Sequence, residues 1–187
     1  ILRRLRNLAE KLKYSGVDAV HELPEVFDYW SQKYVRPLLA ELDYQSLQDF
    51  FVQHILRFAD KSCIRVMSIG AGNCELDLAL VAQLKALGHS NIRYECVEIN
   101  SRMLQRASIK ARELGLADLM VFTEQDIDDW EPGEHPRHHV ILCRQFLHHV
   151  VHLEALMLKL KQAMAPQALF LVDDMVGRNG HMRWPEA

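Results

Sequence analysis

The stretch Ser68-Ile69-Gly70-Ala71-Gly72-Asn73-Cys74-Glu75 decides the fold of this chain. It follows a short apolar run at 64–67 and precedes an amphipathic stretch at 76–87. A β-rich run, a turn with two glycines and a helical pattern together predict a strand, a loop and a helix, which bring backbone N–H groups toward an anionic or polar ligand. A side chain at either glycine would block a ligand from the backbone, and we expect positive φ angles in the turn. The stretch is therefore interpreted as a cofactor-binding loop.

Strand and helix patterns alternate through the rest of the chain. Further β-rich runs lie at 92–97, 119–123, 140–143 and 168–173. The helical patterns between them end at Leu87 before a glycine, run from Asn100 or Ser101 to Leu114, and run from about His149 to Ala163, with Pro166 as the terminator. The alternation predicts an α/β fold with a doubly wound, mostly parallel sheet of about five strands. Ligands bind such sheets at the carboxyl ends of the strands.

The first part of the chain has a different pattern. We expect residues 1–60 to form an N-terminal helical extension or lid, and residues 61–187 to form the α/β core. The first helix is amphipathic with a basic face, and we interpret it as an arm that packs on its own domain or on a second copy, so that a homodimer could form through the N-terminal helices. The aromatic-rich segment 24–42, which Pro37 should divide, could roof a pocket or simply join the core.

Composition excludes some classes of function. The 187 residues carry a net charge of −3, which gives no reason to expect electrostatic binding to nucleic acid or to an anionic membrane. No apolar run approaches the roughly 20 residues of a membrane span, and the N-terminus does not resemble a signal peptide. The four cysteines form no C-x-x-C pair, so we interpret them as reduced, small apolar residues of a cytoplasmic protein.

Glu98 and Glu75 distinguish between two nucleoside cofactors. Glu98 ends the second predicted strand, where its carboxylate could accept both hydrogen bonds of a ribose diol. A dinucleotide-binding loop has the pattern G-x-G-x-x-G, and its third glycine would fall at Glu75, whose carboxylate would repel a pyrophosphate. S-adenosylmethionine has no phosphate and brings an ammonium and a sulfonium group. The acidic loop favours that cationic ligand over NAD.

The stretch from about 64 to 174 resembles a class I S-adenosylmethionine-dependent methyltransferase, a family with a Rossmann-like core. Residues 66–74 match the family's glycine-rich first motif, with Cys74 where a third glycine is common. The resemblance implies that Ser68, Gly70, Ala71 and Gly72 contact the cofactor. Residues 97–104 resemble the second block, in which the acid binds the ribose and the following residues flank the adenine. That block implies a ribose role for Glu98 and an adenine role for Ile99 and Met103.

Two further blocks complete the resemblance. Residues 124–127 resemble the third block, which implies that Asp126, with Ile127 beside it, meets the adenine amino group. Residues 143–149 resemble the block after the fourth strand, which implies that Arg144 contacts the cofactor and that His148 and His149 lie near the methyl group. A histidine there suits the role of base, although the same position often only holds the start of a helix. His148 and His152 are four residues apart and could form half of a metal site, but no acidic residue lies in that run before Glu154, so no metal is predicted.

The tail after the fifth strand carries polar residues toward the expected acceptor site. His181 is a third catalytic candidate there, and Arg178 and Arg183 could bind a carboxylate or phosphate on the acceptor. In the family that the chain resembles, the sheet usually continues with a sixth strand and an antiparallel seventh strand. We therefore expect a chain truncated at its C-terminal side, with part of the substrate site absent.

The sequence as a whole predicts S-adenosylmethionine-dependent methyl transfer to an oxygen or nitrogen atom of a small or medium-sized acceptor molecule. One alternative is a catalytically silent S-adenosylmethionine-binding domain that acts as a scaffold or sensor. A second is an NAD-dependent oxidoreductase, which Glu75 and the absence of a Tyr-x-x-x-Lys motif oppose. A third is RNA methylation, which the basic N-terminal arm favours, while the net charge and the absence of an Asn-Pro-Pro-aromatic block oppose it.

Overall fold

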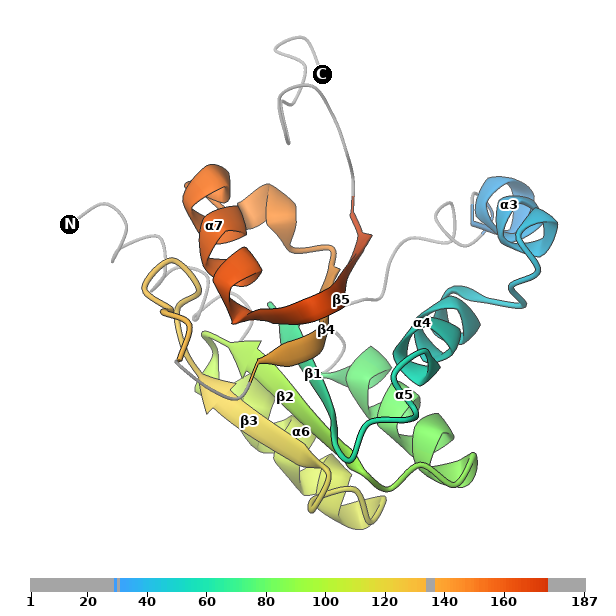
Figure 1. The fold of residues 1–187 in the computed structure, drawn as a ribbon, viewed down its shortest axis with the longest axis horizontal. Helices are drawn as coiled ribbons and strands as arrows, with labels where there is room; N and C mark the ends of the chain where they lie inside the picture. Colours follow the sequence, from blue (N-terminus) through green and yellow to red (C-terminus); the bar gives the residue numbers. More distant parts are fainter. Residues whose placement is uncertain (1–28, 30, 134–136, 175–187) are drawn as a thin grey trace, which may run out of the picture.

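Figure 1 shows the chain as a computed structural model, which describes residues 29, 31–133 and 137–174. The basic first helix and the tail with Arg178, His181 and Arg183 lie outside these residues. The described elements are, in chain order, η1 (Ser31–Val35), α3 (Arg36–Glu41), α4 (Leu47–Leu56), β1 (Ile64–Ile69), α5 (Glu75–Ala86), β2 (Ile92–Glu98), α6 (Ser101–Glu113), β3 (Met120–Glu124), β4 (His138–Arg144), η2 (Leu147–His149), α7 (Leu153–Ala163) and β5 (Met164–Asp173).

The five strands form one sheet in the order β3-β2-β1-β4-β5, and every neighbouring pair is parallel. This confirms the predicted doubly wound α/β fold with a Rossmann-like core. The strand order reverses beside β1, because β2 lies on one side of it and β4 on the other. In open parallel sheets that reversal opens a crevice at the carboxyl ends of the strands. The glycine turn follows β1 and therefore lies at this crevice.

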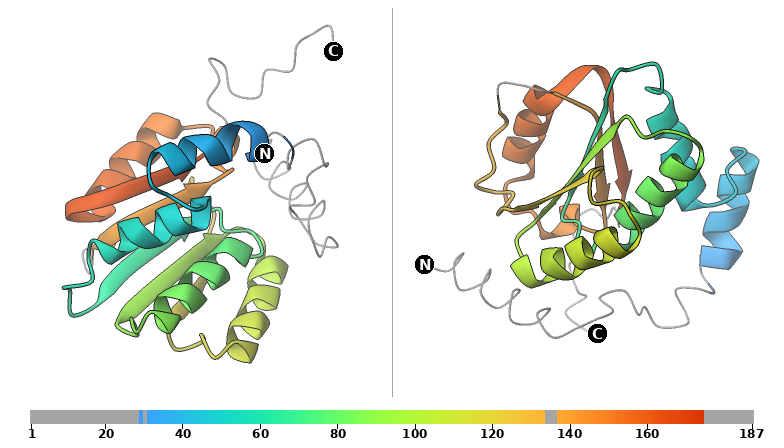
Figure 2. Two further views of the ribbon diagram at one scale, coloured as in Figure 1. Left: turned by 90° about the vertical axis from the view of Figure 1, so that its right-hand side faces the viewer. Right: turned by 90° about the horizontal axis from the view of Figure 1, so that it is seen from below.

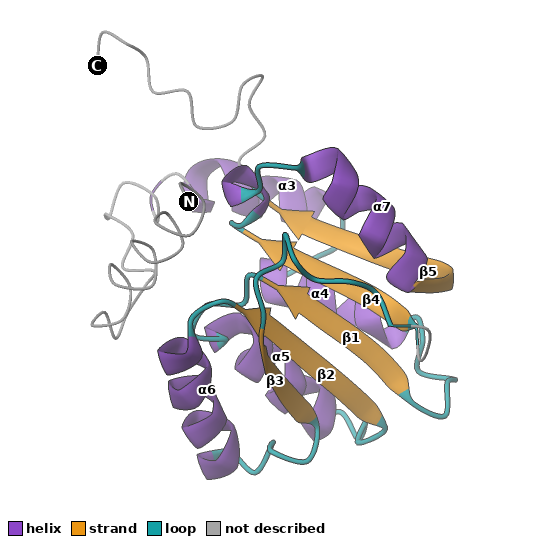
Figure 3. Ribbon diagram, turned by 90° about the vertical axis from the view of Figure 1, so that its left-hand side faces the viewer, coloured by secondary structure: helices purple, strands orange, loops and turns teal. Residues whose placement is uncertain are grey.

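Helices cover both faces of the sheet. Figures 2 and 3 show α4, α5 and α6 on one face and α7 on the other. The alternation of side chains along β1 explains both layers. Val66 points into the core shared with α4, α5 and α6, whereas Met67 and Ile69 point into the core shared with α7. Among the described residues, no helix is long and apolar enough to cross a membrane.

The glycine turn has the backbone conformation that the sequence predicts. Gly70 and Gly72 have φ angles of +63° and +58°, in the left-handed region that glycine adopts without strain. A methyl group added at Gly70 would collide with the ring of Phe146, whereas one at Gly72 would meet no atom within 4 Å. Cys74 is the N-cap of α5 and also has a left-handed φ angle of +56°.

Capping residues fix the ends of the other helices. The side chain of Ser46 accepts a hydrogen bond from the backbone N–H of Asp49 and so begins α4. Asn100 caps α6 in the same way, as the sequence predicts, by accepting from the N–H of Arg102. Gly88 and Gly115 follow α5 and α6 with φ angles of +91° and +67°, and each ends its helix.

Two predicted boundaries around α7 are wrong. The helix expected from about His149 begins at Leu153, because residues 147–149 form a separate 3-10 turn. The predicted end of this helix at Ala163 is confirmed, but Pro166 is not its terminator. Pro166 instead lies inside β5, which begins at Met164 rather than at 168. An edge strand tolerates proline, because the missing N–H can face away from the neighbouring strand.

Helix α4 lies in the stretch predicted as an extension, yet it contributes to the core. Phe51, Val52 and Ile55 are buried against α5 and the sheet, in one cluster with Leu80 and Leu84. By contrast, η1 and α3 have no buried residue. Pro37 lies in the first turn of α3, where the π-helical η1 passes into an α-helix without a break, so it marks a change of helix type and does not divide the segment. The division into an extension and a core stays a prediction.

Candidate functional site

A hollow lies at the carboxyl ends of β1, β2 and β3, beside the turn that follows β4. We call it the first hollow. Its empty volume is about 460 Å³, including space open to solvent. Five of the predicted cofactor-binding residues line it together: Gly70, Glu98, Ile99, Asp126 and Ile127. They come from three loops, because parallel strands direct all of those loops to the same edge of the sheet.

Glu98 ties the glycine turn to the end of β2. One carboxylate oxygen accepts a hydrogen bond from the backbone N–H of Gly72 at 3.0 Å, and the other accepts from the N–H of Asn100 at 2.9 Å. A carboxylate has about four lone-pair positions, so each oxygen can accept more than one hydrogen bond. Glu98 thus both shapes the turn and presents acceptor oxygens to the first hollow.

Asp126 and Ile127 form the side of the first hollow that follows β3. The carboxylate of Asp126 accepts a hydrogen bond from the backbone N–H of Asp128 at 3.0 Å, which fixes its direction. Ile127 is buried with Met67 and Ile69 and gives this side an apolar surface. Met103, which the sequence places beside the adenine, is buried and does not line the first hollow.

A second hollow lies on the other side of Gly70. It encloses about 340 Å³, again including space open to solvent, and Gly70 is the residue that lines both hollows. Three more predicted cofactor-binding residues line it, namely Ser68, Ala71 and Arg144. Glu75, which the sequence identifies as the residue unfavourable to a pyrophosphate, also lies there. Eight of the ten predicted cofactor-binding residues thus line one hollow or the other, whereas Gly72 and Met103 line neither.

Arg144 gives the second hollow a positive charge. Its Nε lies 3.3 Å from the carboxylate of Asp173 at the end of β5, and both side chains are about one-third exposed. An exposed pair of this kind contributes little stability. The guanidinium keeps further N–H donors for a carboxylate. With Glu75 nearby, the second hollow carries both signs of charge.

His148 and Asp174 form a buried pair beside the first hollow. Nδ1 of His148 lies 2.7 Å from the Asp174 carboxylate, and their side chains are 8% and 3% exposed. The other oxygen of Asp174 accepts from the backbone N–H groups of Phe146 and Leu147, at 2.9 and 2.6 Å. Asp174 therefore holds the turn η2 in place together with His148. His148 is not among the residues that line the first hollow.

His149 is the predicted catalytic candidate that lines the first hollow. Its ring packs on the ring of His148 with a centroid separation of 4.1 Å, and it also lies near Phe146. Phe146 covers Gly70, so the aromatic side chains that follow β4 reach the glycine turn. The third candidate, His181, lies outside the described residues.

Sequence reasoning missed several residues of the site. The first hollow is also lined by Val97, Gln125, Asp128, Phe146 and Val150. Most of these adjoin a predicted residue, so their positions directly after strands could have indicated them. Asp174 also follows a strand directly, but nothing in the local sequence indicates that it pairs with His148, 26 residues before it.

Two comparisons bear on the family. The sequence profile of a family described as a methyltransferase domain matches residues 44–185. The chain belongs to this methyltransferase family. The match includes the glycine turn, Glu98 and Asp126, and it confirms the class I resemblance that the motifs predict. A search of curated proteins gave no match to the chain.

Solved structures share the fold of the chain at low sequence identity. An S-adenosylmethionine-dependent methyltransferase from Geobacter sulfurreducens, in complex with S-adenosyl-L-homocysteine, has a TM-score of 0.51 at 18% identity. Coclaurine N-methyltransferase, bound to N-methylheliamine and S-adenosylhomocysteine, has a TM-score of 0.54 at 19% identity. The cyclase SpnF has a TM-score of 0.54 at 17% identity.

The chain is shorter than these neighbours. The alignments cover 67%, 68% and 67% of this chain, and 46%, 35% and 43% of the three neighbours respectively. The aligned part is thus less than half of each neighbour. At these identities the likeness shows the fold and no more.

Proposed function

We propose that the chain binds S-adenosylmethionine across both hollows and transfers its methyl group to an oxygen or nitrogen atom of a small or medium-sized acceptor. One observation carries the proposal: the motif residues of a methyltransferase line two hollows that meet at Gly70. In this arrangement Glu98 accepts hydrogen bonds from the ribose hydroxyls. Asp126 faces the adenine amino group, and Ile99 and Ile127 pack on the ring.

The methionine end of the cofactor would then cross the glycine turn into the second hollow. Its carboxylate suits the guanidinium of Arg144, and its ammonium suits the carboxylate of Glu75. The backbone at Gly72 is open, so the ligand can approach the turn closely. This charge pattern also favours the sulfonium cofactor over NAD, whose pyrophosphate Glu75 would repel.

The acceptor would reach the methyl group from the side of η2. Methyl transfer from a sulfonium is an in-line displacement, so the protein mainly positions the acceptor and removes a proton from an O–H or N–H⁺ group. We assign the base role to the pair His148–His149. His149 lines the first hollow, and Asp174 holds the Nδ1 side of His148, an arrangement that makes Nε2 its basic nitrogen.

The test of cofactor class is calorimetric titration of the chain with S-adenosylhomocysteine and, in parallel, with NAD. We expect micromolar binding of S-adenosylhomocysteine and none of NAD. Binding of NAD alone would favour the oxidoreductase alternative. Turnover is then tested with labelled S-adenosylmethionine against panels of amines, phenols and carbon acids, so that binding without any transfer would support a silent scaffold.

Substitution of the histidines separates a base from a structural residue. If His149 is the base, His149→Ala lowers turnover while affinity for S-adenosylhomocysteine is retained. A structural role of His148 predicts that His148→Ala lowers thermal stability as Asp174→Ala does, because both changes leave buried partners without a hydrogen bond. Full activity of both histidine variants would remove the base assignment.

Three further parts of the proposal concern partners and location. We keep a homodimer through the N-terminal helices as a prediction, to be tested by light scattering of the chain with and without residues 1–28. The net charge of −3 supports a small-molecule acceptor over RNA. The four free thiols support a location in the cytoplasm, where thiols stay reduced.

A further inference from the structure

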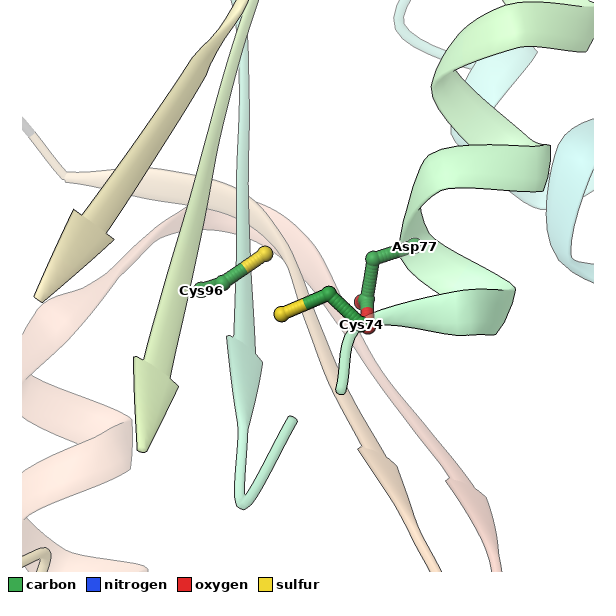
Figure 4. A group of neighbouring side chains, drawn as sticks. All are labelled: Cys74, Asp77 and Cys96. Atoms are coloured by element: carbon green, nitrogen blue, oxygen red, sulfur yellow. The ribbon is translucent and has the colours of Figure 1, made fainter. Parts of the chain in front are cut away.

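Two thiols and a carboxylate meet directly beneath the glycine turn. Cys74 is the N-cap of α5, Asp77 lies in the first turn of α5, and Cys96 lies in β2. Their ligand atoms all lie within 4.8 Å of one another. Figure 4 shows the sulfur atoms of Cys74 and Cys96 pointing toward each other, with Asp77 beside them. The three residues are at most 3% exposed, so the protein holds three potential metal ligands in its interior.

Asp77 is a buried carboxylate whose hydrogen-bond partners are hydroxyls, and the charge of Arg144, which lines the same hollow, acts on it from beyond ion-pair distance. The hydroxyl of Tyr94 donates to it at 2.8 Å, and Ser68 gives a second hydrogen bond. Among the described residues no Lys, Arg or His side chain forms an ion pair with it. Burial raises the pKa of Asp77, which reflects the cost of a carboxylate charge in this interior. A bound cation would offset that cost.

The donor set suits zinc. Zn²⁺ is bound in proteins by thiolate sulfur, imidazole nitrogen and carboxylate oxygen, and sites with three protein ligands keep a fourth position for water. Ligands are usually oriented by a second layer of hydrogen bonds, and Tyr94 and Ser68 supply such bonds to Asp77. Asp77 and Ser68 also line the second hollow, which gives an ion and a water molecule a path to the cluster.

We propose that Cys74, Asp77 and Cys96 bind one Zn²⁺ ion per chain, with a water molecule from the second hollow as the fourth ligand. Two S–Zn bonds form as the two S–H protons pass to solvent, and no group is oxidised. The ion links the glycine turn to β2, close to the positions of Gly72 and Glu98. It therefore holds the cofactor-binding loop in place without taking part in methyl transfer.

Cobalt titration of the metal-free chain tests this proposal without any cofactor. We expect Co²⁺ to bind at one ion per chain, with a thiolate-to-cobalt charge-transfer band in the near ultraviolet that Zn²⁺ abolishes. Zn²⁺ should also protect two of the four thiols from a thiol reagent added with mild denaturant. Absence of both the band and the protection would overturn the proposal. Neither result depends on whether S-adenosylhomocysteine binds.

Variants identify the ligands. Cys96→Ala should abolish the charge-transfer band, and Tyr94→Phe should weaken Co²⁺ binding about tenfold or more by freeing the ligand carboxylate. The matched control is Cys143→Ala, which removes another buried thiol outside the cluster. Loss of the band in the Cys143 variant would contradict the assignment. Circular dichroism checks that each variant folds. If a variant does not fold, the protection of thiols by Zn²⁺ in the unchanged chain still tests the proposal. Formation of a disulfide between Cys74 and Cys96 in the presence of Zn²⁺ would also contradict their assignment as zinc ligands.

Discussion

The two hollows beside Gly70 differ in what they offer a ligand. The first hollow combines apolar side chains with carboxylates that neighbouring backbone N–H groups already hold, such as Glu98 and Asp126. The second hollow carries charges of both signs, with Arg144, Glu75 and the buried Asp77 at its lining. The first suits a neutral, flat group with hydroxyls, and the second suits a zwitterion. The glycine turn thus lies between a hollow that suits the shape of a ligand and a hollow that suits its charges.

The largest expected effect comes from filling the space between the hollows. Gly70→Ala should lower the free energy of unfolding by about 2–4 kcal/mol, because the new methyl group strains a left-handed residue and collides with Phe146. Gly72→Ala is the control, since it adds the same strain without a collision and should cost about 1 kcal/mol. Urea denaturation without cofactor measures both. Equal losses would show that Phe146 does not pack on Gly70.

A change in the first hollow should weaken every ligand that contains adenosine. Glu98→Ala removes a charged hydrogen-bond acceptor, so affinity for S-adenosylhomocysteine should fall by about 1.5–3 kcal/mol. Free adenosine, which lacks the methionine end, should lose affinity by a similar factor. Calorimetry with both ligands measures this, and Glu124→Ala, at the neighbouring strand end, serves as the control. Unchanged affinity would refute the assignment of Glu98 to the ribose.

A change in the second hollow should discriminate between the same two ligands. Arg144→Gln should weaken S-adenosylhomocysteine by about 1 kcal/mol, roughly fivefold, because the side chain is partly exposed and already paired with Asp173. Adenosine should bind this variant as it binds the unchanged chain. Equal losses for the two ligands would mean that the hollows do not divide the cofactor as proposed.

The smallest effect lies at the opposite end of β4, away from both hollows. Nδ1 of His139 accepts a hydrogen bond from the backbone N–H of Arg65, and burial lowers the pKa of this histidine. A lowered pKa in the folded state means that the unfolded chain takes up the proton first. Stability from this group is therefore present above about pH 6.5 and is lost as the pH falls toward the folded-state pKa.

His139→Asn tests this pH dependence, because asparagine keeps an acceptor that does not take up a proton in this range. The fall in unfolding free energy below pH 6.5 should become shallower in His139→Asn. His152→Asn replaces an exposed histidine and should leave the slope unchanged. The prediction fails if the two variants show the same slope. Neither change should alter affinity for S-adenosylhomocysteine.

The residues that sequence analysis placed correctly share one property: they follow a strand. The sequence predicts that Gly70, Glu98 and Asp126 lie close together, because parallel strands end at one edge of the sheet. The contacts that it missed join side chains across the fold. Phe146 covers Gly70, and Asp174 holds His148, and neither contact leaves a pattern in local sequence. Pro166 misled for a related reason, since only the position of β5 at the edge explains why a proline fits there.

The place of β1 in the sheet also bears on the order in which the molecule folds. Strand β1 pairs with β2, the next strand in the chain, but also with β4, and the contact of Arg65 with His139 closes a loop of 74 residues. Closing long loops costs entropy before it brings contacts, so we expect β1, α5 and β2 to form first and β4 to join later. The glycine turn would then form early while Phe146 and His149 arrive late. Pulsed hydrogen exchange during refolding would show amides of β1 and β2 protected before those of β4. During synthesis, the chain would likewise have the part of the cofactor site after β1 and β2 before the part after β4 exists.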